Sequence, residues 1–157
     1  MGTAKTTSVR LAQPPDCDAL ARMRAALWAE SSSEEHAQEL AAILAGKSLG
    51  ILPLVEFVSE AGDGTLIGFI EVSLRSYAEG CDPTRPVGYV EGWYVVESHR
   101  RKGVGADLLR AAENWARSQG CLEMASDAAI DNLASQRAQE ALGFEVVERS
   151  VNFRKRL

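Results

Sequence analysis

The chain has 157 residues and a formal net charge of -5 at pH 7, with 46% hydrophobic and 25% charged residues. This length and balance predict a single soluble domain over residues 1–157. No apolar run reaches the roughly 18 residues of a membrane span, and the first residues lack the apolar core of a signal peptide, so neither membrane insertion nor export is expected. The acidic balance disfavours nucleic acid as a partner and suits a cationic one, although solubility alone also explains it.

The cysteines and histidines indicate reduced thiols and no metal. The chain has three cysteines, Cys17, Cys81 and Cys121, which is an odd number, and no two of them form a CxxC pair. This pattern predicts reduced thiols in a cytoplasmic protein rather than a disulfide framework. His36 and His99 lie far apart and form no spaced set with cysteines or carboxylates, so no metal site is expected.

Apolar spacing and turn residues predict two helices and then a β-hairpin in the first half of the chain. The expected elements are a strand over 7–11, helices over 16–29 and 34–45, and strands over 52–59 and 65–75 joined by a turn at 61–64. A long loop over 76–86 follows, and long ordered loops in small domains are often functional.

The second half predicts a strand–turn–helix–strand unit and then a terminal hairpin. The expected elements are a strand over 87–96, a helix over 104–118, a strand over 121–125, a helix over 131–142 and strands over 144–147 and 150–156. The order predicts a mixed α/β (α+β) domain built around one sheet.

The turn before the helix at 104–118 carries the clearest chemical signal. Three basic residues lead into two glycines, and an amphipathic helix begins at once. Backbone N–H groups at the positive end of a helix, approached without a Cβ, favour a pyrophosphate. The residues after Gly105 fit neither a P-loop nor a dinucleotide fingerprint. A solvated helix cap is the alternative interpretation.

The pattern Arg-x-x-Gly-x-Gly at 100–105 resembles the acetyl-CoA pyrophosphate motif of GNAT N-acetyltransferases. In that family the preceding strand is bulged and splays from the next parallel strand, and the pantetheine arm lies in the gap. Gly92 lies in the middle of the strand over 87–96, where a glycine indicates a bulge or a close approach of the backbone to another group. Asn132, Ala134-Ser135 and the segment 141–144 are similar to the family's next motif.

The resemblance implies a GNAT fold: a mostly antiparallel sheet of about six to seven strands, splayed between the fourth and fifth, with about four helices. It also implies acetyl-CoA as co-substrate. The residues implied to bind it are Trp93, Tyr94, Val95, Arg100, Arg101, Lys102, Gly103, Val104, Gly105, Ala106, Asn132 and Ser135.

The sequence departs from the family at one position. Many members carry a tyrosine four residues before the last glycine of this motif, and it protonates the departing thiolate. Gln139 stands there and cannot act as an acid. Another residue or water supplies the proton, or no proton is needed. A thiol has a pKa of about 8.5, so the thiolate is a tolerable leaving group without protonation.

Two carboxylates are candidates for catalysis on an amine. An alkylammonium must lose its proton before it attacks, which costs roughly 4 kcal/mol at neutral pH. Glu91 lies just before Gly92, on the alternating face of Tyr89 and Trp93, and can accept that proton. A salt bridge to a neighbouring arginine is the alternative. Asp127 follows a strand end, where ligands gather, although it can also be an N-cap.

A narrower likeness links the chain to aminoglycoside 6′-N-acetyltransferases. It rests on residues 77–82, 90–92, 123–127 and 154–156 and on Leu27-Trp28. It implies Trp28, Tyr77, Glu91 and Asp127 as substrate contacts, with Glu79 and Asp82 as additions from the long loop, and a homodimer. Carboxylates and aromatic faces suit a polyamino sugar, while core packing explains Trp28 equally well.

The predicted function is therefore acetyl transfer from acetyl-CoA to the 6′-amine of an aminoglycoside, which gives antibiotic resistance. Two other functions stay open at this point. The first is a GNAT enzyme for another amine, such as a polyamine or a protein N-terminus. The second is a non-catalytic CoA-binding domain, which Gln139 slightly favours and the two carboxylates disfavour.

Overall fold

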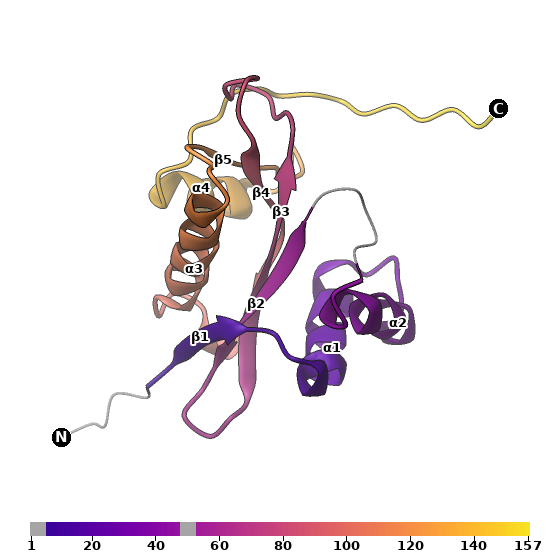
Figure 1. Cartoon of the computed structure of the whole chain (residues 1–157), viewed down its shortest axis with the longest axis vertical. Helices are drawn as coiled ribbons and strands as arrows, with labels where there is room; N and C mark the ends of the chain where they lie inside the picture. Colours follow the sequence, from indigo (N-terminus) through magenta and orange to yellow (C-terminus); the bar gives the residue numbers. More distant parts are fainter. Residues whose placement is uncertain (1–5, 48–52) are drawn as a thin grey trace.

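The computed structural model describes residues 6–47 and 53–157, and in these it has five strands, four α-helices and two short 3₁₀ helices (Figure 1). Residue 52, the first of one predicted strand, lies outside the described residues. The elements are β1 Ser8–Leu11, η1 Pro14–Asp16, α1 Cys17–Leu27, α2 Ser33–Leu44, β2 Leu54–Glu60, β3 Leu66–Arg75, β4 Val87–Val95, η2 Glu97–His99, α3 Val104–Ser118, β5 Met124–Ser126 and α4 Leu133–Ala141.

The strands form one sheet in the order β1-β2-β3-β4-β5. The first three pairings are antiparallel, and β4 pairs with β5 in parallel. This last pairing joins only Gly88–Val90 to Met124–Ser126, so the remainder of β4 has no neighbour in β5. The predicted divergence of the fourth and fifth strands is therefore confirmed.

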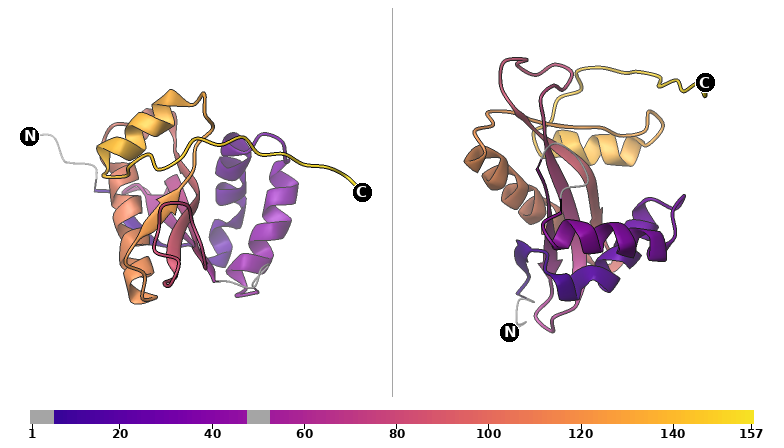
Figure 2. Two further views of the ribbon diagram at one scale, coloured as in Figure 1. Left: turned by 90° about the horizontal axis from the view of Figure 1, so that it is seen from above. Right: turned by 45° about the vertical axis from the view of Figure 1, so that its right-hand side comes forward.

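Helices cover both faces of the sheet. Seen from above, α1 and α2 lie on one side and α3 on the other, with α4 beyond the end of α3 (Figure 2). One core cluster joins β3 and β4 to α3 through Ile70, Val90 and Leu108. The second joins the opposite face to α1 and α2 through Leu20, Leu40 and Phe69. Within the described residues, no helix is long and apolar enough to cross a membrane.

A β-bulge interrupts the pairing of β3 with β4. Glu71 pairs with Gly92 and Val72 pairs with Val90, which leaves Glu91 as the extra residue. The bulge that Gly92 predicts is thus confirmed. It also corrects one expectation, because an extra residue shifts the alternation of side chains. Trp93 packs in the cluster on the α3 face, whereas Glu91 contacts side chains on the α1 face.

The predicted terminal hairpin is wrong, and with it the count of six to seven strands. Residues 144–157 form no strand. Phe144 still packs against the core on the α3 face and Val147 lies beside Gly80, and the chain after residue 149 runs away from the sheet as an extended arm (Figure 1). A strand is stable only where a neighbour satisfies its backbone groups, and this arm has no such neighbour within the described chain. Its apolar side chains stay exposed, at 71% for Val151 and 93% for Phe153.

Candidate active site

The turn between β4 and α3 presents backbone N–H groups at the start of a long helix. Gly103 is the N-cap residue with φ 84°, and no side chain caps it. The N–H groups of a first helical turn have no acceptor within the helix, and they lie at the positive end of its dipole. A Cβ on Gly103 would meet no atom within 4 Å, so the turn is open. This geometry suits a pyrophosphate.

The basic side chains of this turn also stabilise its shape. Arg100 Nε donates to the carbonyl of Val95 at 2.8 Å, and its guanidinium carbon lies 5.6 Å from the centre of the Tyr94 ring. Lys102 Nζ donates to the carbonyl of Ser98 at 2.8 Å. The positive charges of Arg100 and Lys102 therefore stay beside the open helix end, and the backbone N–H groups remain free to donate hydrogen bonds to an anion.

Where β4 leaves β5, the backbone rather than the side chains of β4 remains available to a ligand. Trp93 packs under α3, since a Cβ on Gly105 would lie 3.5 Å from its ring. The buried Nε1 of Trp93 has no hydrogen-bond partner within the described residues. Tyr94 packs in the cluster on the opposite face. The backbone N–H and C=O groups of residues 93–95 that point away from β3, other than the Val95 carbonyl bound by Arg100, thus suit the amide-bearing pantetheine arm.

Glu91 projects from the bulge and is held by two neighbours on β3. Ser73 Oγ donates to Glu91 Oε1 at 2.6 Å. Arg75 donates to both oxygens, with Nε 3.0 Å from Oε1 and Nη2 2.8 Å from Oε2. The guanidinium carbon of Arg75 lies 3.5 Å from the centre of the Tyr89 ring. The salt bridge weighed from the sequence is therefore formed, and the Glu91 side chain stays 25% exposed.

Asp127 follows β5 and lies on the same side of the site as Tyr89. Burial raises the pKa of Tyr89, and the negative charge of Asp127 raises it further. Asp127 is exposed, and it is not the cap of the next helix, because Asn132 is the N-cap residue of α4. Glu91 and Asp127 thus both act electrostatically on Tyr89, next to the divergence of β4 and β5.

Trp28 follows α1 and contacts the bulge directly. A Cβ on Gly92 would lie 2.4 Å from Trp28 Cη2, so only a glycine permits this contact. The ring also lies 6.0 Å from the ring of His36 and 6.1 Å from that of Phe69, centre to centre. Trp28 is therefore part of the core, as one interpretation of the sequence predicts, and lies against the bulge that carries Glu91; its contact with a substrate stays a prediction.

The long loop between β3 and β4 carries acidic and aromatic side chains beside the start of β5. Tyr77 is 57% exposed, and its hydroxyl donates to Glu79, which raises the pKa of Tyr77. Asp82 accepts from the Thr84 hydroxyl and N–H, which lowers its pKa, and its own N–H donates to Glu123 at 2.8 Å. Tyr77 and Glu79 are thus open to a ligand, whereas Asp82 shapes the loop.

The residues of the second predicted motif meet at the start of α4. Asn132 Oδ1 accepts from the N–H of Ser135 at 3.1 Å and so caps the helix. Gln139 Nε2 lies 3.3 Å from Ser135 Oγ and 3.4 Å from the carbonyl of Asp127. Gln139 therefore faces the divergence of β4 and β5 as an amide donor, and no acid replaces the family's tyrosine at this position.

A buried ionic cluster lies behind the bulge. Arg24 Nη1 is 3.3 Å from carboxylate oxygens of both Glu56 and Glu71, and its Nη2 is 2.7 Å from Glu39. Burial raises the pKa of Glu56, and its hydrogen bond with Glu71 raises it further. Because Glu71 pairs with Gly92, this cluster supports the strand pairing at the bulge.

The described residues contain no group of three or more His, Cys, Asp and Glu that could hold a metal.

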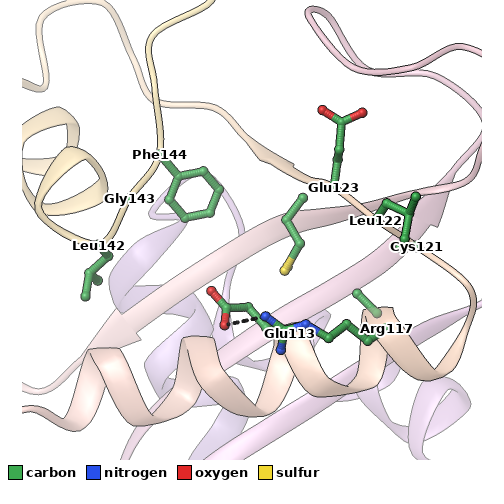
Figure 3. A pocket seen from close by; sticks show the side chains of 10 residues that line it. Glu113, Arg117, Cys121, Leu122, Glu123, Leu142, Gly143 and Phe144 are labelled. Atoms are coloured by element: carbon green, nitrogen blue, oxygen red, sulfur yellow. Dashed lines mark ion pairs between the residues drawn. The ribbon is translucent and has the colours of Figure 1, made fainter.

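A separate cavity of about 230 Å³ lies away from these carboxylates, between α3 and the segment after α4. Figure 3 shows Phe144 and Leu142 on one side of it and Cys121 and Leu122 on the other, with the Glu113–Arg117 ion pair of α3 across its floor. It borders β5 and has none of the predicted site residues in its lining.

Comparison with known proteins assigns this geometry to a family. Residues 18–144 match the model of the acetyltransferase (GNAT) family. The chain belongs to the GNAT acetyltransferase family. The match spans α1 to Phe144 and so includes the bulged strand, the open turn and α3.

GNAT relatives with assigned activities cover almost the whole chain. The aminoglycoside N(6′)-acetyltransferase type 1 of Klebsiella aerogenes is 44% identical over 95% of this chain and 96% of its own length. The enzyme of the same name from Serratia marcescens is 43% identical over 89% and 92%. The structure of AAC(6′)-Iy with the bisubstrate analogue CoA-S-monomethyl-acetylneamine has a TM-score of 0.85 at 34% identity, covering 97% of this chain and 99% of that one.

Sequence reasoning missed Arg75 and Tyr89 as members of the site. Both lie on the α1 face, one on β3 and one on β4; Arg75 binds Glu91, and the Tyr89 ring packs against the Arg75 guanidinium. The signal was present as the polar residues Glu71, Ser73 and Arg75, which alternate with apolar ones along β3.

Proposed function

We propose that this protein transfers the acetyl group of acetyl-CoA to the 6′-amino group of aminoglycosides. The observation that carries this proposal is the pair of carboxylates Glu91 and Asp127, which both act on Tyr89 beside the point where β4 and β5 part. Relatives up to 44% identical bear the name of this activity. One structure similar to this chain contains CoA, with a TM-score of 0.89 and 34% identity over 100% of this chain and 99% of that one.

In the proposed complex, the uncapped start of α3 binds the pyrophosphate of acetyl-CoA. Its N–H groups, with Arg100 and Lys102 beside them, neutralise the phosphate charge. The backbone groups of residues 93–95 that point away from β3 hold the pantetheine arm. The N–H groups of this bulged strand also polarise the thioester carbonyl, which develops negative charge during attack.

Glu91 acts on the nucleophile in this proposal. The 6′-ammonium binds the carboxylate, which takes its proton directly or through one water. The nitrogen lone pair then attacks the thioester carbon. The tetrahedral intermediate loses a second proton from its nitrogen to water, the C–S bond breaks, and the thiolate departs. Asp127 holds a second ammonium group, and Trp28 and Tyr77 offer aromatic faces to the cation. Gln139 donates no proton, so water protonates the thiolate or it leaves unprotonated.

A homodimer is the proposed assembly. The arm after residue 149 exposes Val151 and Phe153, and large exposed apolar side chains on an extended segment indicate a missing partner. β5 has β4 as its single neighbour in the described sheet, so its outer edge can accept a strand. The arm of a second copy, placed beside β5, buries the exposed apolar side chains and pairs with the free edge of β5. The three free cysteines support a cytoplasmic location for this assembly.

The test is thiol release from acetyl-CoA by purified protein, with tobramycin or kanamycin as acceptor and spermidine in parallel. We expect rapid release with the aminoglycosides and little with spermidine. Faster release with spermidine would assign the enzyme to another amine. Absence of release with every amine, despite CoA binding, would leave a non-catalytic domain.

Two variants test the assigned roles. Glu91→Gln keeps the shape of the side chain but not its basicity, so kcat/KM is expected to fall by about 10²–10⁴. Asp127→Asn is expected to raise KM for the aminoglycoside more than it lowers kcat. Glu113→Gln on α3, outside the site, is the matched control and should behave like the parent. An active Glu91→Gln protein would remove Glu91 from the mechanism.

A further inference from the structure

Arg75 occupies the carboxylate to which the substrate must bind. Its Nη2 lies 2.8 Å from Glu91 Oε2, and Nε and Nη2 lie 3.0 and 2.9 Å from Oε1. Within the described residues, Arg75 is the one hydrogen-bond partner of Oε2. An ammonium group that binds this oxygen has to displace the guanidinium or share the carboxylate with it.

The surroundings of Arg75 allow it to leave. Its side chain is 43% exposed, and besides Glu91 it contacts the face of the Tyr89 ring. Arg24, by comparison, is held by three carboxylates and is 5% exposed. Exchange of one cation for another leaves the Glu91 carboxylate paired throughout, so the contact with an incoming ammonium offsets the loss of the guanidinium.

Glu91 stays oriented when Arg75 leaves. Ser73 Oγ donates to Oε1 at 2.6 Å from the neighbouring strand, independently of the guanidinium. The bulge that projects Glu91 rests on Trp28 and on the pairing of Glu71 with Gly92. Removal of Arg75 therefore frees a carboxylate that is already in position.

We propose that Arg75 is a specificity-determining residue, an exchangeable counter-ion of Glu91 that every substrate amine must replace. The inference rests on the proposed function of Glu91. A monoamine merely substitutes one cation for another and gains little. A polyamino sugar gains further contacts at Asp127 and at the aromatic faces, and so outcompetes the guanidinium. Arg75 thus disfavours simple amines, which is selection by an opposing contact.

The deciding variant is Arg75→Met, which keeps an apolar stem over Tyr89 and removes the charge. Steady-state thiol release is measured with tobramycin and with 6-amino-6-deoxyglucose, which carries a single amine. We expect KM for tobramycin to fall about tenfold, the combined effect of one exposed ion pair and one cation–π contact, with little change in kcat. For the monoamine, kcat/KM should rise at least as much, which relaxes the selectivity. Arg110→Met, the loss of a surface charge on α3, is the control for net charge.

Other outcomes overturn the proposal. A large fall in kcat with KM unchanged would make Arg75 a positioning residue of Glu91. A KM that is equal to or higher than that of the parent would exclude competition for the carboxylate. Calorimetric titration of tobramycin into both proteins tests the exchange without turnover, with a tenfold lower Kd expected for Arg75→Met. Failure of the parent to acetylate tobramycin would instead refute the proposed function, and equal Kd values would refute the role of Arg75.

Discussion

The contact between Gly92 and Trp28 predicts that one methyl group will disturb both stability and activity. In Gly92→Ala, the new Cβ would lie 2.4 and 2.5 Å from two carbons of the indole ring and 3.3 Å from Leu27 Cδ2. The ring cannot swing aside freely, since Arg24, His36 and Phe69 surround it. Overpacking of this kind costs about 1–3 kcal/mol. For a domain of this size, that corresponds to a fall in Tm of about 2–12 °C.

The measurement is thermal unfolding of the parent, Gly92→Ala and a matched glycine variant, with tobramycin kinetics on each. Gly62→Ala lies in the turn between β2 and β3, and its Cβ would lie 3.6 Å from a backbone oxygen, an ordinary contact. It should unfold close to the parent temperature. Because the bulge projects Glu91, Gly92→Ala should also lose kcat/KM. A Gly92→Ala protein with the Tm and kinetics of the parent would refute the close packing of ring and bulge.

Three further predictions concern stability and assembly. Arg24→Met leaves buried Glu56 without its cation and should cost about 3–5 kcal/mol in urea unfolding, whereas a loss below about 1 kcal/mol would contradict the cluster. The guanidinium of Arg10 lowers the pKa of Asp16, so this pair stabilises the fold above the unfolded pKa near 3.8 and loses its effect as pH falls through the lower folded value. Asp16→Asn should therefore lower Tm at neutral pH, and the difference should close in acid; a constant difference would exclude the linkage. Phe153→Asp should yield monomers in sedimentation velocity, and an intact dimer would show that Phe153 is not in the interface.

Much of the fold could be predicted from local sequence signals. The apolar stripe and the glycines around α3 predict its bounds, and the helix over 104–118 is confirmed. Gly92 inside an apolar strand predicts the bulge, and the pattern at 100–105 predicts the open helix end. These features depend on residues close together in the chain, and the backbone conformations they need are properties of those residues.

The environment of Glu91 could be predicted only in part. A carboxylate within a strand indicates a partner or a function, and the structure provides Arg75 and Ser73 as partners from β3. Which side chains meet across two strands depends on register, and an extra residue in one strand changes the face of every residue beyond it. Trp93 shows this directly, since it lies on the opposite face from that expected.

The sequence by itself determined the family, most of the elements, the glycine-rich turn with an open helix start and the two candidate carboxylates. The tertiary structure decided that Trp28 supports the bulge, that Arg75 covers Glu91 and that the C-terminal arm pairs with no strand within the described chain. These contacts join residues far apart in the chain, or depend on a partner strand. Local propensity does not encode them, because they arise when packing brings distant surfaces together and each backbone group must find a partner.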